Sequence, residues 1–291
     1  ALRDPAIIPF FPEINPFVNV RGSFFYLEKN VVEAVCFLEN FNHHGKCEIG
    51  SVVNDAKEKF DIIITDPPYG DDIRYGEQSE FFYLWVYRVL KDFFPYLPDH
   101  SPLEEDFCVS TFRFGNKKRA EYFYKTGLKK SFSSMNNSLK DDGLLVVFFA
   151  HSSTEAWNIF LESIRNGKFK VVSSYSIHTE MASSILAMNK TSFMSSIVVV
   201  CRKILQPSEV YFEDLIPQIE DKIKNMLEQI PGERLLSLPI TDLLIMVYGK
   251  VLEASTQHTE LKSYQKDFTP DFETLIKDAR SFIMKELVGK I

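Results

Sequence analysis

The four residues Asp66-Pro67-Pro68-Tyr69 carry the most specific chemical pattern in this sequence. An exocyclic amine on a base is a poor nucleophile, because its lone pair is delocalised into the ring. A carboxylate and a backbone carbonyl that accept its two N–H groups would free the lone pair, if both acceptors are held rigidly. Proline fixes φ and brings no competing N–H donor. A neighbouring aromatic ring can stack on a base swung out of its helix. The pattern suits methyl transfer to a base amine; the alternative is a strand end beside an exposed tyrosine.

Residues 60–65, directly before this pattern, predict a buried strand, and the carboxyl end of such a strand is where open α/β sheets bind ligands. Further strands are predicted in KCEIGSV (46–52), GLLVVFFA (143–150), FKVVSSYSIHTE and SSIVVVCRK, the last two forming a hairpin at a sheet edge. Helical spacing is found in 23–41, in 77–94, in the basic stretch 111–130 as far as KDDG, and in STEAWNIFLESIRNG. Ser152 and Glu155 stand at capping-box spacing before the last of these helices. We expect an α/β protein with a mostly parallel sheet covered on both faces, and core packing for the aromatic helix 77–94.

Composition divides the chain into three parts. Residues 1–22, with prolines at 5, 9, 12 and 16, predict an extended arm. Residues 23–205 hold the predicted strands and the helices between them, and form the expected catalytic part. Residues 206–291 contain 10 Lys+Arg and 15 Asp+Glu, and indicate an acidic helical region without strands.

Charge and cysteine usage narrow the class of protein. A net charge of −7 argues against a protein that coats nucleic acid, although residues 111–130 hold seven basic residues and one acid. Lys117, Lys118 and Arg119 in that stretch would suit a phosphate backbone; the alternative is a solvated helix face. No apolar run could span a membrane, and no signal peptide is found. The four cysteines lie far apart without a C-x-x-C pair, so we expect reduced thiols, a cytoplasmic protein and no metal.

Several blocks together resemble one known family. NPFVNVRGSFFYLEKNVVEAV, TDPPYGDDIRYGEQSEFFYLWVYR, VVFFAHSSTEAWNIFLESI, YSIHTEMASSILAMNKTSFMSSIVVVCRK and DLLIMVYGKVLEA follow in order. They resemble the later part of the prokaryotic adenine-specific DNA methylases of the zinc-ribbon-containing family, from about Pro12 to about Ala254. The resemblance implies a Rossmann-like class I methyltransferase sheet, S-adenosylmethionine as cofactor, and a flipped adenine of double-stranded DNA as substrate. A cytosine amine or RNA target, or a catalytically silent nucleic-acid-binding or assembly subunit, are the alternatives.

The resemblance also implies roles for individual residues. Asp66 and the Pro67 carbonyl would hold the amine, Pro68 would stiffen the turn, and Tyr69 would stack on the base. Gly50 and Ser51 take the place of a Gly-Asp pair often found in such enzymes, and with Asp66 are the expected cofactor-binding residues. The residues expected to contact substrate are Asp71, Asp72, Tyr75, Lys117, Lys118, Arg119, His151, Thr179 and Glu180. For His151 the alternative is a histidine satisfied at a helix cap, and for residues 179–180 a plain connector.

Two features of the family are missing from this sequence. The zinc-ribbon cysteines are absent, and the twelve glycines include no G-x-G loop to cradle the cofactor. In the family's sheet the motif strand lies beside the strand that opens this loop, and KCEIGSV would lie two positions further out. No segment here can supply the strands between, and unpaired buried backbone groups cost about 1–3 kcal/mol each. We therefore expect an incomplete methyltransferase, completed by a second chain or a missing N-terminal segment that carries the glycine-rich loop.

Overall fold

The structure is a computed structural model. It describes residues 15, 17–18, 20, 23–40, 45–46, 48, 50–70, 74–151, 153–178, 195–268 and 270–288. Contacts divide the chain into two units, residues 2–50 and 51–291. In the first unit the predicted helix is confirmed as α1 (Phe24–Leu38), which Ser23 caps by accepting a hydrogen bond from the Tyr26 amide. No described helix is long and apolar enough to cross a membrane.

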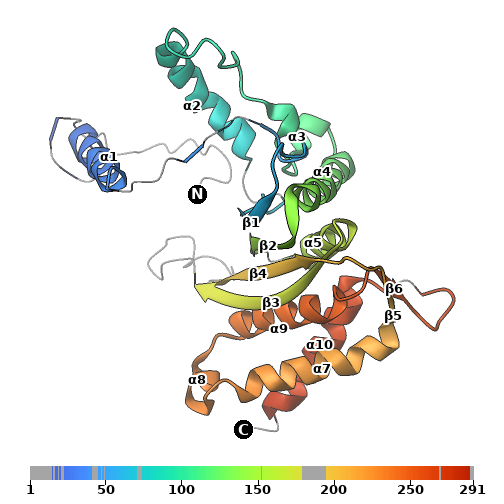
Figure 1. The fold of residues 1–291 in the computed structure, drawn as a ribbon. Helices are drawn as coiled ribbons and strands as arrows, with labels where there is room; N and C mark the ends of the chain where they lie inside the picture. Colours follow the sequence, from blue (N-terminus) through green and yellow to red (C-terminus); the bar gives the residue numbers. More distant parts are fainter. Residues whose placement is uncertain are drawn as a thin grey trace. The chain divides into compact units, whose positions relative to one another are not determined.

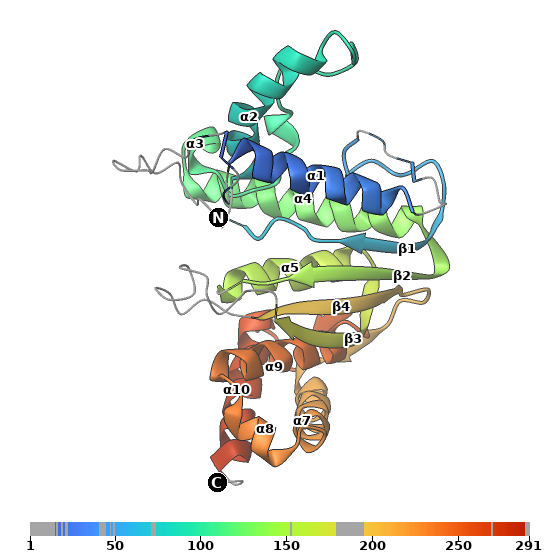
Figure 2. The same ribbon diagram turned by 90° about the vertical axis from the view of Figure 1, so that its left-hand side faces the viewer.

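The second unit is built on a four-stranded mixed sheet (Figures 1 and 2). Its strands are β1 (Phe60–Thr65), β2 (Leu139–Phe149), β3 (Phe169–His178) and β4 (Ser195–Lys203), in the order β1-β2-β4-β3. The α/β class is therefore confirmed, and so is the hairpin of β3 and β4 at one edge. The expected mostly parallel sheet is wrong, because β1–β2 is parallel while β2–β4 and β4–β3 are antiparallel.

Helices lie between the strands of this sheet, and a helical region follows it. Between the strands lie α2 (Tyr75–Leu90), the 3-10 turn Leu103–Glu105, α3 (Thr111–Phe114), α4 (Lys117–Ser138) and α5 (Thr154–Asn166). After β4 come α7 (Phe212–Glu228), α8 (Gly232–Ser237), α9 (Ile240–Ser255) and α10 (Phe272–Val288). Two short strands, β5 (Glu209–Tyr211) and β6 (Glu260–Lys262), pair in parallel in this region, where no strand was expected.

Three local expectations differ from the structure. The described residues of 46–52 contain no strand, and they form no ladder with the edge strand β1. The basic helix is broken at Gly115, which has a left-handed φ of 75° and ends α3. Ser153 rather than Ser152 caps α5, through a hydrogen bond of 3.2 Å from the Glu155 amide to its hydroxyl.

One face of the sheet carries the core. Phe149 at the end of β2 stacks on Phe160 of α5, with ring centroids 4.2 Å apart. Its antiparallel partner on β4, Ile197, lies against Gly249 of α9. The side chains of these paired residues point to the same face of the sheet, so α5 and α9 cover the same face. α4 packs against α5 on this side as well.

The opposite face is apolar and uncovered within the described part of residues 51–291. Ile62 and Ile64 of β1 are 55% and 69% exposed, and they pair with Leu144 and Val146 of β2, which are only partly buried. Residues paired in a parallel ladder point to the same side. Coverage of both faces was expected and is wrong for this part of the chain. The strand that bears the motif thus has one free edge and one bare face.

Candidate active site

The motif lies at the carboxyl end of β1, beside the carboxyl end of β2. Residues 66–69 form neither helix nor strand, so contacts from outside must set their geometry. Because β1 and β2 are parallel, with Thr65 opposite Val147, both strands end at the same edge of the sheet. His151, two residues beyond β2, therefore reaches the same edge as Asp66.

Asp66 and Tyr69 are joined to each other. The Asp66 residue is exposed, and its Oδ1 accepts a hydrogen bond from the Tyr69 hydroxyl. The Tyr69 ring stands edge-on to Phe149, with centroids 5.5 Å apart and planes at 82°. The carboxylate and the aromatic ring that the proposed chemistry needs are thus next to each other, and the ring is supported by the core strand β2.

The turn after the motif is fixed by residues that the sequence did not single out. The Tyr124 hydroxyl, from α4, donates a hydrogen bond of 2.9 Å to the Pro68 carbonyl. The Val109 amide donates one of 2.9 Å to the Gly70 carbonyl. Gly70 has a φ of 70°, a conformation that costs little only for glycine. Neither Tyr124 nor Val109 is near the motif in sequence, so no local signal could have found them.

His151 is buried against the turn. Its Nδ1 accepts a hydrogen bond of 2.8 Å from the Ser153 amide, which assigns the proton of the neutral ring to Nε2. Its carbonyl accepts a bond of 2.8 Å from the Trp157 indole. The His151 ring lies close to Gly70: a Cβ atom added to Gly70 would be 3.5 Å from His151 Nε2. A small cavity of about 150 Å³, lined by Gly70, Tyr124 and His151 among others, lies beside the motif. Contact of His151 with substrate remains a prediction.

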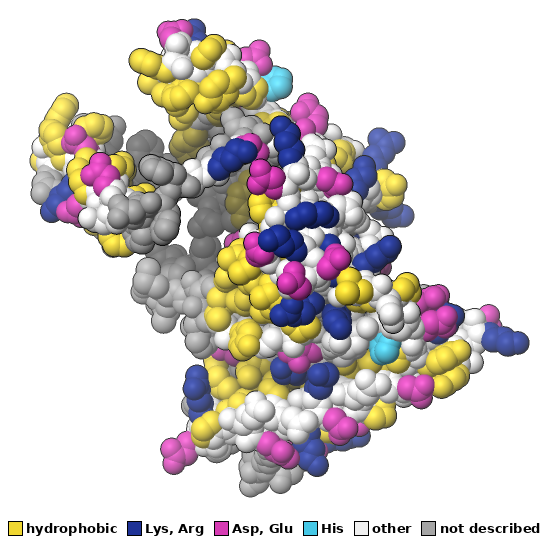
Figure 3. All heavy atoms as spheres, viewed as in Figure 1, with side chains coloured by type: hydrophobic (Ala, Val, Ile, Leu, Met, Phe, Trp, Pro, Cys, Tyr) yellow, Lys and Arg dark blue, Asp and Glu magenta, His cyan; other side chains and the backbone are white. Residues whose placement is uncertain are grey.

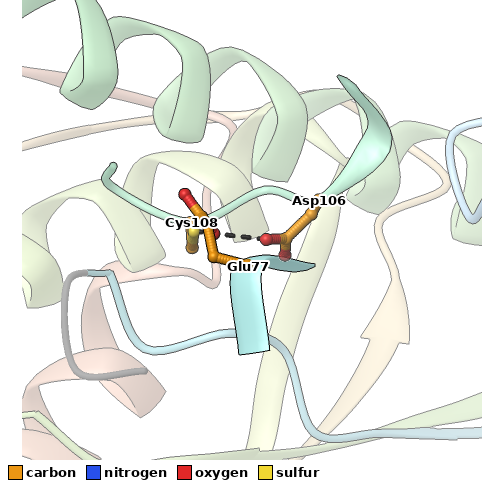
Figure 4. Close-up of side chains that lie close together, drawn as sticks. All are labelled: Glu77, Asp106 and Cys108. Carbon is orange, nitrogen blue, oxygen red and sulfur yellow. Dashed lines mark hydrogen bonds between the residues drawn. The ribbon is translucent and has the colours of Figure 1, made fainter. Parts of the chain in front are cut away.

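A second cluster lies on the segment that follows the motif. Glu77, Asp106 and Cys108 bring two carboxylates and a thiol within 4.8 Å of one another (Figure 4). Arg113 binds them together: its Nε lies 3.0 Å from Glu77 Oε1 and its Nη2 lies 2.8 Å from Asp106 Oδ2. Asp106 also accepts a bond of 2.9 Å from the Gly76 amide. The first turn of α2 is thereby tied to residues 106–113.

The charges of this cluster favour an ion-pair network over a metal site. Burial, with the nearby Asp106 carboxylate, raises the pKa of the Cys108 thiol to about 12, and the thiol donates to Asp106 at 3.3 Å. The Arg113 guanidinium already forms ion pairs with both carboxylates. The cluster is therefore best described as a clamp between α2 and α3.

The other predicted residues are scattered. Tyr75 begins α2 and is exposed. Lys117, Lys118 and Arg119 form the exposed first turn of α4, where Lys117 Nζ lies 3.2 Å from Glu121. Gly50 ends the first unit and Ser51 begins the second, and their cofactor role remains a prediction. Asp71, Asp72, Thr179 and Glu180 lie outside the described residues.

The described residues do not include the glycine-rich loop expected to hold S-adenosylmethionine. The strand that bears Asp66 is an edge strand, so the described residues of the sheet flank the motif on one side only. The sequence has no G-x-G loop to place on the other side. A comparison of the chain with protein-family models, curated proteins and solved structures found no match. Function must therefore be inferred from the motif and its surroundings.

Proposed function

We propose that this chain is the motif-bearing part of an S-adenosylmethionine-dependent enzyme that methylates the exocyclic amino group of adenine in DNA. The observation that carries the proposal is the Asp66–Tyr69 motif at the carboxyl end of β1, which exposes the Asp66 carboxylate and is held from outside by Tyr124. The order of the strands and the hairpin at the far edge are also compatible with four of the seven strands of a class I methyltransferase sheet.

In this proposal the chain binds and orients the base amine. The Asp66 carboxylate accepts one amino hydrogen and the Pro67 carbonyl accepts the other, which draws the nitrogen toward tetrahedral geometry. The Tyr69 ring then supports the face of the base, a contact typically worth about 1–3 kcal/mol. Because Tyr69 donates to Asp66 Oδ1, an incoming amine must use the other oxygen or displace this bond.

The methyl donor has to be held by a partner. The free edge of β1 and the bare face formed by Ile62, Ile64, Leu144 and Val146 are where a further strand and its helices would join the sheet. An apolar edge of this kind invites pairing with another strand. We therefore assign the glycine-rich cofactor loop to a second chain, or to a preceding segment of the same chain, that completes the sheet at β1.

The test is a comparison of two acid substitutions on the same strand. The chain is expressed with its neighbouring coding sequences in a host that lacks adenine methylation, and methylated nucleosides are measured by mass spectrometry. Asp66→Ala should lower N6-methyladenine by at least about 100-fold, as is typical for removal of one group that stabilises a transition state. Asp61→Ala, which removes only an exposed ion pair with Lys140 from the other end of β1, should not lower it.

Two outcomes would contradict the proposal. Equal methylation by the two variants would exclude Asp66 from the chemistry. DNA without a methylated base, in cells where the wild-type chain and its partners accumulate, would favour the alternative of a silent assembly subunit. Methylated cytosine or methylated RNA would move the proposal to the other substrates considered.

A further inference from the structure

Tyr124 is buried in the core at the point where α4 passes under the motif. It is 1% exposed and lies on the buried side of the helix with Ala120, Gly127 and Leu128. Gly127, one turn further, lies so close to Phe107 that a Cβ atom there would be 2.1 Å from the Phe107 ring. This close approach fixes the helix, and with it the position of the Tyr124 ring, relative to residues 107–110.

The Tyr124 hydroxyl meets the backbone of the motif rather than another side chain. It donates to the Pro68 carbonyl at 2.9 Å, and the backbone of Gly70 interacts with the same oxygen. One hydroxyl thus contacts the residues on both sides of Tyr69. Burial raises the pKa of Tyr124, so the hydroxyl stays protonated and remains a donor throughout the physiological range.

The other side of the turn is held independently. The Gly70 carbonyl accepts from the Val109 amide, and residues 106–110 are in turn held by Arg113. The two prolines provide no amide of their own. The bonds from Tyr124 and from Val109 therefore both help to set the conformation of residues 66–70, and the acceptor of the Tyr124 bond, Pro68, lies next to Pro67.

We propose that Tyr124 is a positioning residue, whose hydroxyl holds the Pro68–Gly70 backbone so that the Pro67 carbonyl and the Tyr69 ring keep their orientation toward the base. Its catalytic consequence rests on the proposed function, whereas its effect on the turn does not. Removal of the hydroxyl leaves the Pro68 carbonyl without this donor and allows the turn to move. A small displacement of positioned groups lowers turnover more than it lowers binding.

The test uses Tyr124→Phe, which keeps the buried ring, with Tyr122→Phe as the matched control. Tyr122 lies on the same helix and is 73% exposed. In the purified chain, hydrogen exchange at the Gly70 and Val109 amides should speed up by at least about 5-fold in Tyr124→Phe, the effect of one lost hydrogen bond. It should not change in Tyr122→Phe. In the methylating assembly, Tyr124→Phe should lower kcat about 10- to 100-fold and change KM for DNA by less than about 3-fold.

The exchange and kinetic results together distinguish the positioning role of Tyr124 from the proposed function. Unchanged exchange at Gly70 and Val109 in folded Tyr124→Phe would overturn the positioning role, and so would normal kcat despite faster exchange. Faster exchange in an assembly whose wild type transfers no methyl group would instead contradict the proposed function. If Tyr124→Phe does not fold, hydrogen exchange in the wild-type chain tests the positioning role instead. In that case, Gly70 and Val109 amides exchanging as fast as the exposed loop amide of Lys57 would overturn the proposal.

Discussion

Arg113 is the residue that ties together groups far apart in the sequence. It forms ion pairs with Glu77 and Asp106, and it donates to the backbone carbonyls of Leu103 and Asp106. Burial by itself would raise the pKa of Glu77, but the hydrogen bonds from Ser110 and Arg113 and the charge of Arg113 outweigh it. The net effect is a lowered pKa, so the clamp depends on Glu77 being ionised.

This lowered pKa predicts a pH dependence of stability. A carboxylate whose pKa falls on folding stabilises the fold above its unfolded value of about 4.3, and the contribution is lost as the pH drops through the folded value. Glu77→Gln should cost about 1–3 kcal/mol of unfolding free energy near neutral pH, because Arg113 loses a buried partner. Its stability should also fall less than that of the wild type below about pH 4.3.

Urea denaturation across this pH range measures the effect without screening the ion pairs. Glu58→Gln, an exposed acid in the loop before β1, gives the effect of removing one surface carboxylate. Parallel curves for the wild type and Glu77→Gln would show that the clamp does not respond to Glu77 ionisation.

The sequence could identify the motif but not its supports. Asp66 to Tyr69 are consecutive, and an apolar run followed by this pattern is a local signal, although β1 is largely exposed rather than buried as expected. Tyr124 reaches Pro68 across 56 residues of chain, and Arg113 reaches Glu77 across 36. Contacts of that range depend on tertiary packing, which periodicity does not encode.

The helices and strands, too, could be predicted where the signal is local, but not where they depend on tertiary packing. β1, β2, the β3–β4 hairpin and α5 could be predicted because each carries a clear apolar period. The absence of a strand in the described residues of 46–52 and the unexpected pair β5–β6 show the limit, because strand pairing depends on which distant segments come together and not on the local pattern alone. Gly115 breaks the basic stretch into α3 and α4, although helical spacing continues through it.

The first turn of α4 is basic at the end of the helix where the macrodipole is already positive. Lys117, Lys118 and Arg119 lie there, and this turn has no acid. Each cation at such a position costs about 0.3–1 kcal/mol unless an anion is near. Further along, Lys125 and Lys129 both pair with Glu162 at 2.8 and 2.7 Å. Figure 3 shows the resulting mixture of basic and acidic side chains over this region. The first turn is the better candidate for phosphate contact.

Replacing these three residues with Gln should weaken DNA binding equally across sequences. Each phosphate contact adds about 0.9 to the slope of log K against log salt. We expect the slope to fall by about 2 rather than by about 3, because Lys117 already pairs with Glu121. Lys224, Lys277 and Lys285, all exposed in the C-terminal helices, form a control of equal charge. An equal slope for both triple variants would leave the first turn of α4 as a solvated face.

Exposed apolar surface is the most unusual property of the described part of the chain. Besides the bare sheet face, α2 exposes Phe81, Phe82, Trp85 and Val89, so the expected core packing of this helix is wrong in the described residues. Hydrophobic side chains cover the α2 region in Figure 3. Contiguous apolar patches of this kind mark interaction surfaces. These apolar side chains are typical of a hydrophobic core. The described part of the chain contains no second layer that would bury them.

This surface leads to a prediction about assembly. Ile62→Lys with Ile64→Lys changes two exposed residues, so the unfolding free energy of the chain alone should stay within about 0.5 kcal/mol of the wild type. In the assembly those positions become buried, and losing each isoleucine costs about 1.5–3 kcal/mol before the cost of burying an ammonium group. The affinity for the partner should therefore fall by at least about 100-fold, and so should the methylation that depends on this association. Leu205→Lys, at an equally exposed apolar position after β4, is the control and should leave both unchanged.

The open side of β1 also determines how tightly the purified chain should bind the cofactor. With one side of the motif strand open, S-adenosylmethionine should bind the chain alone no more tightly than about 1 mM by calorimetry. Addition of the completing chain or segment should restore tight binding, and the Ile62→Lys, Ile64→Lys variant should not respond to it. Micromolar binding by the chain alone would show that these residues already form a cofactor site. Full methylation by the double lysine variant would show that the partner joins elsewhere than at β1.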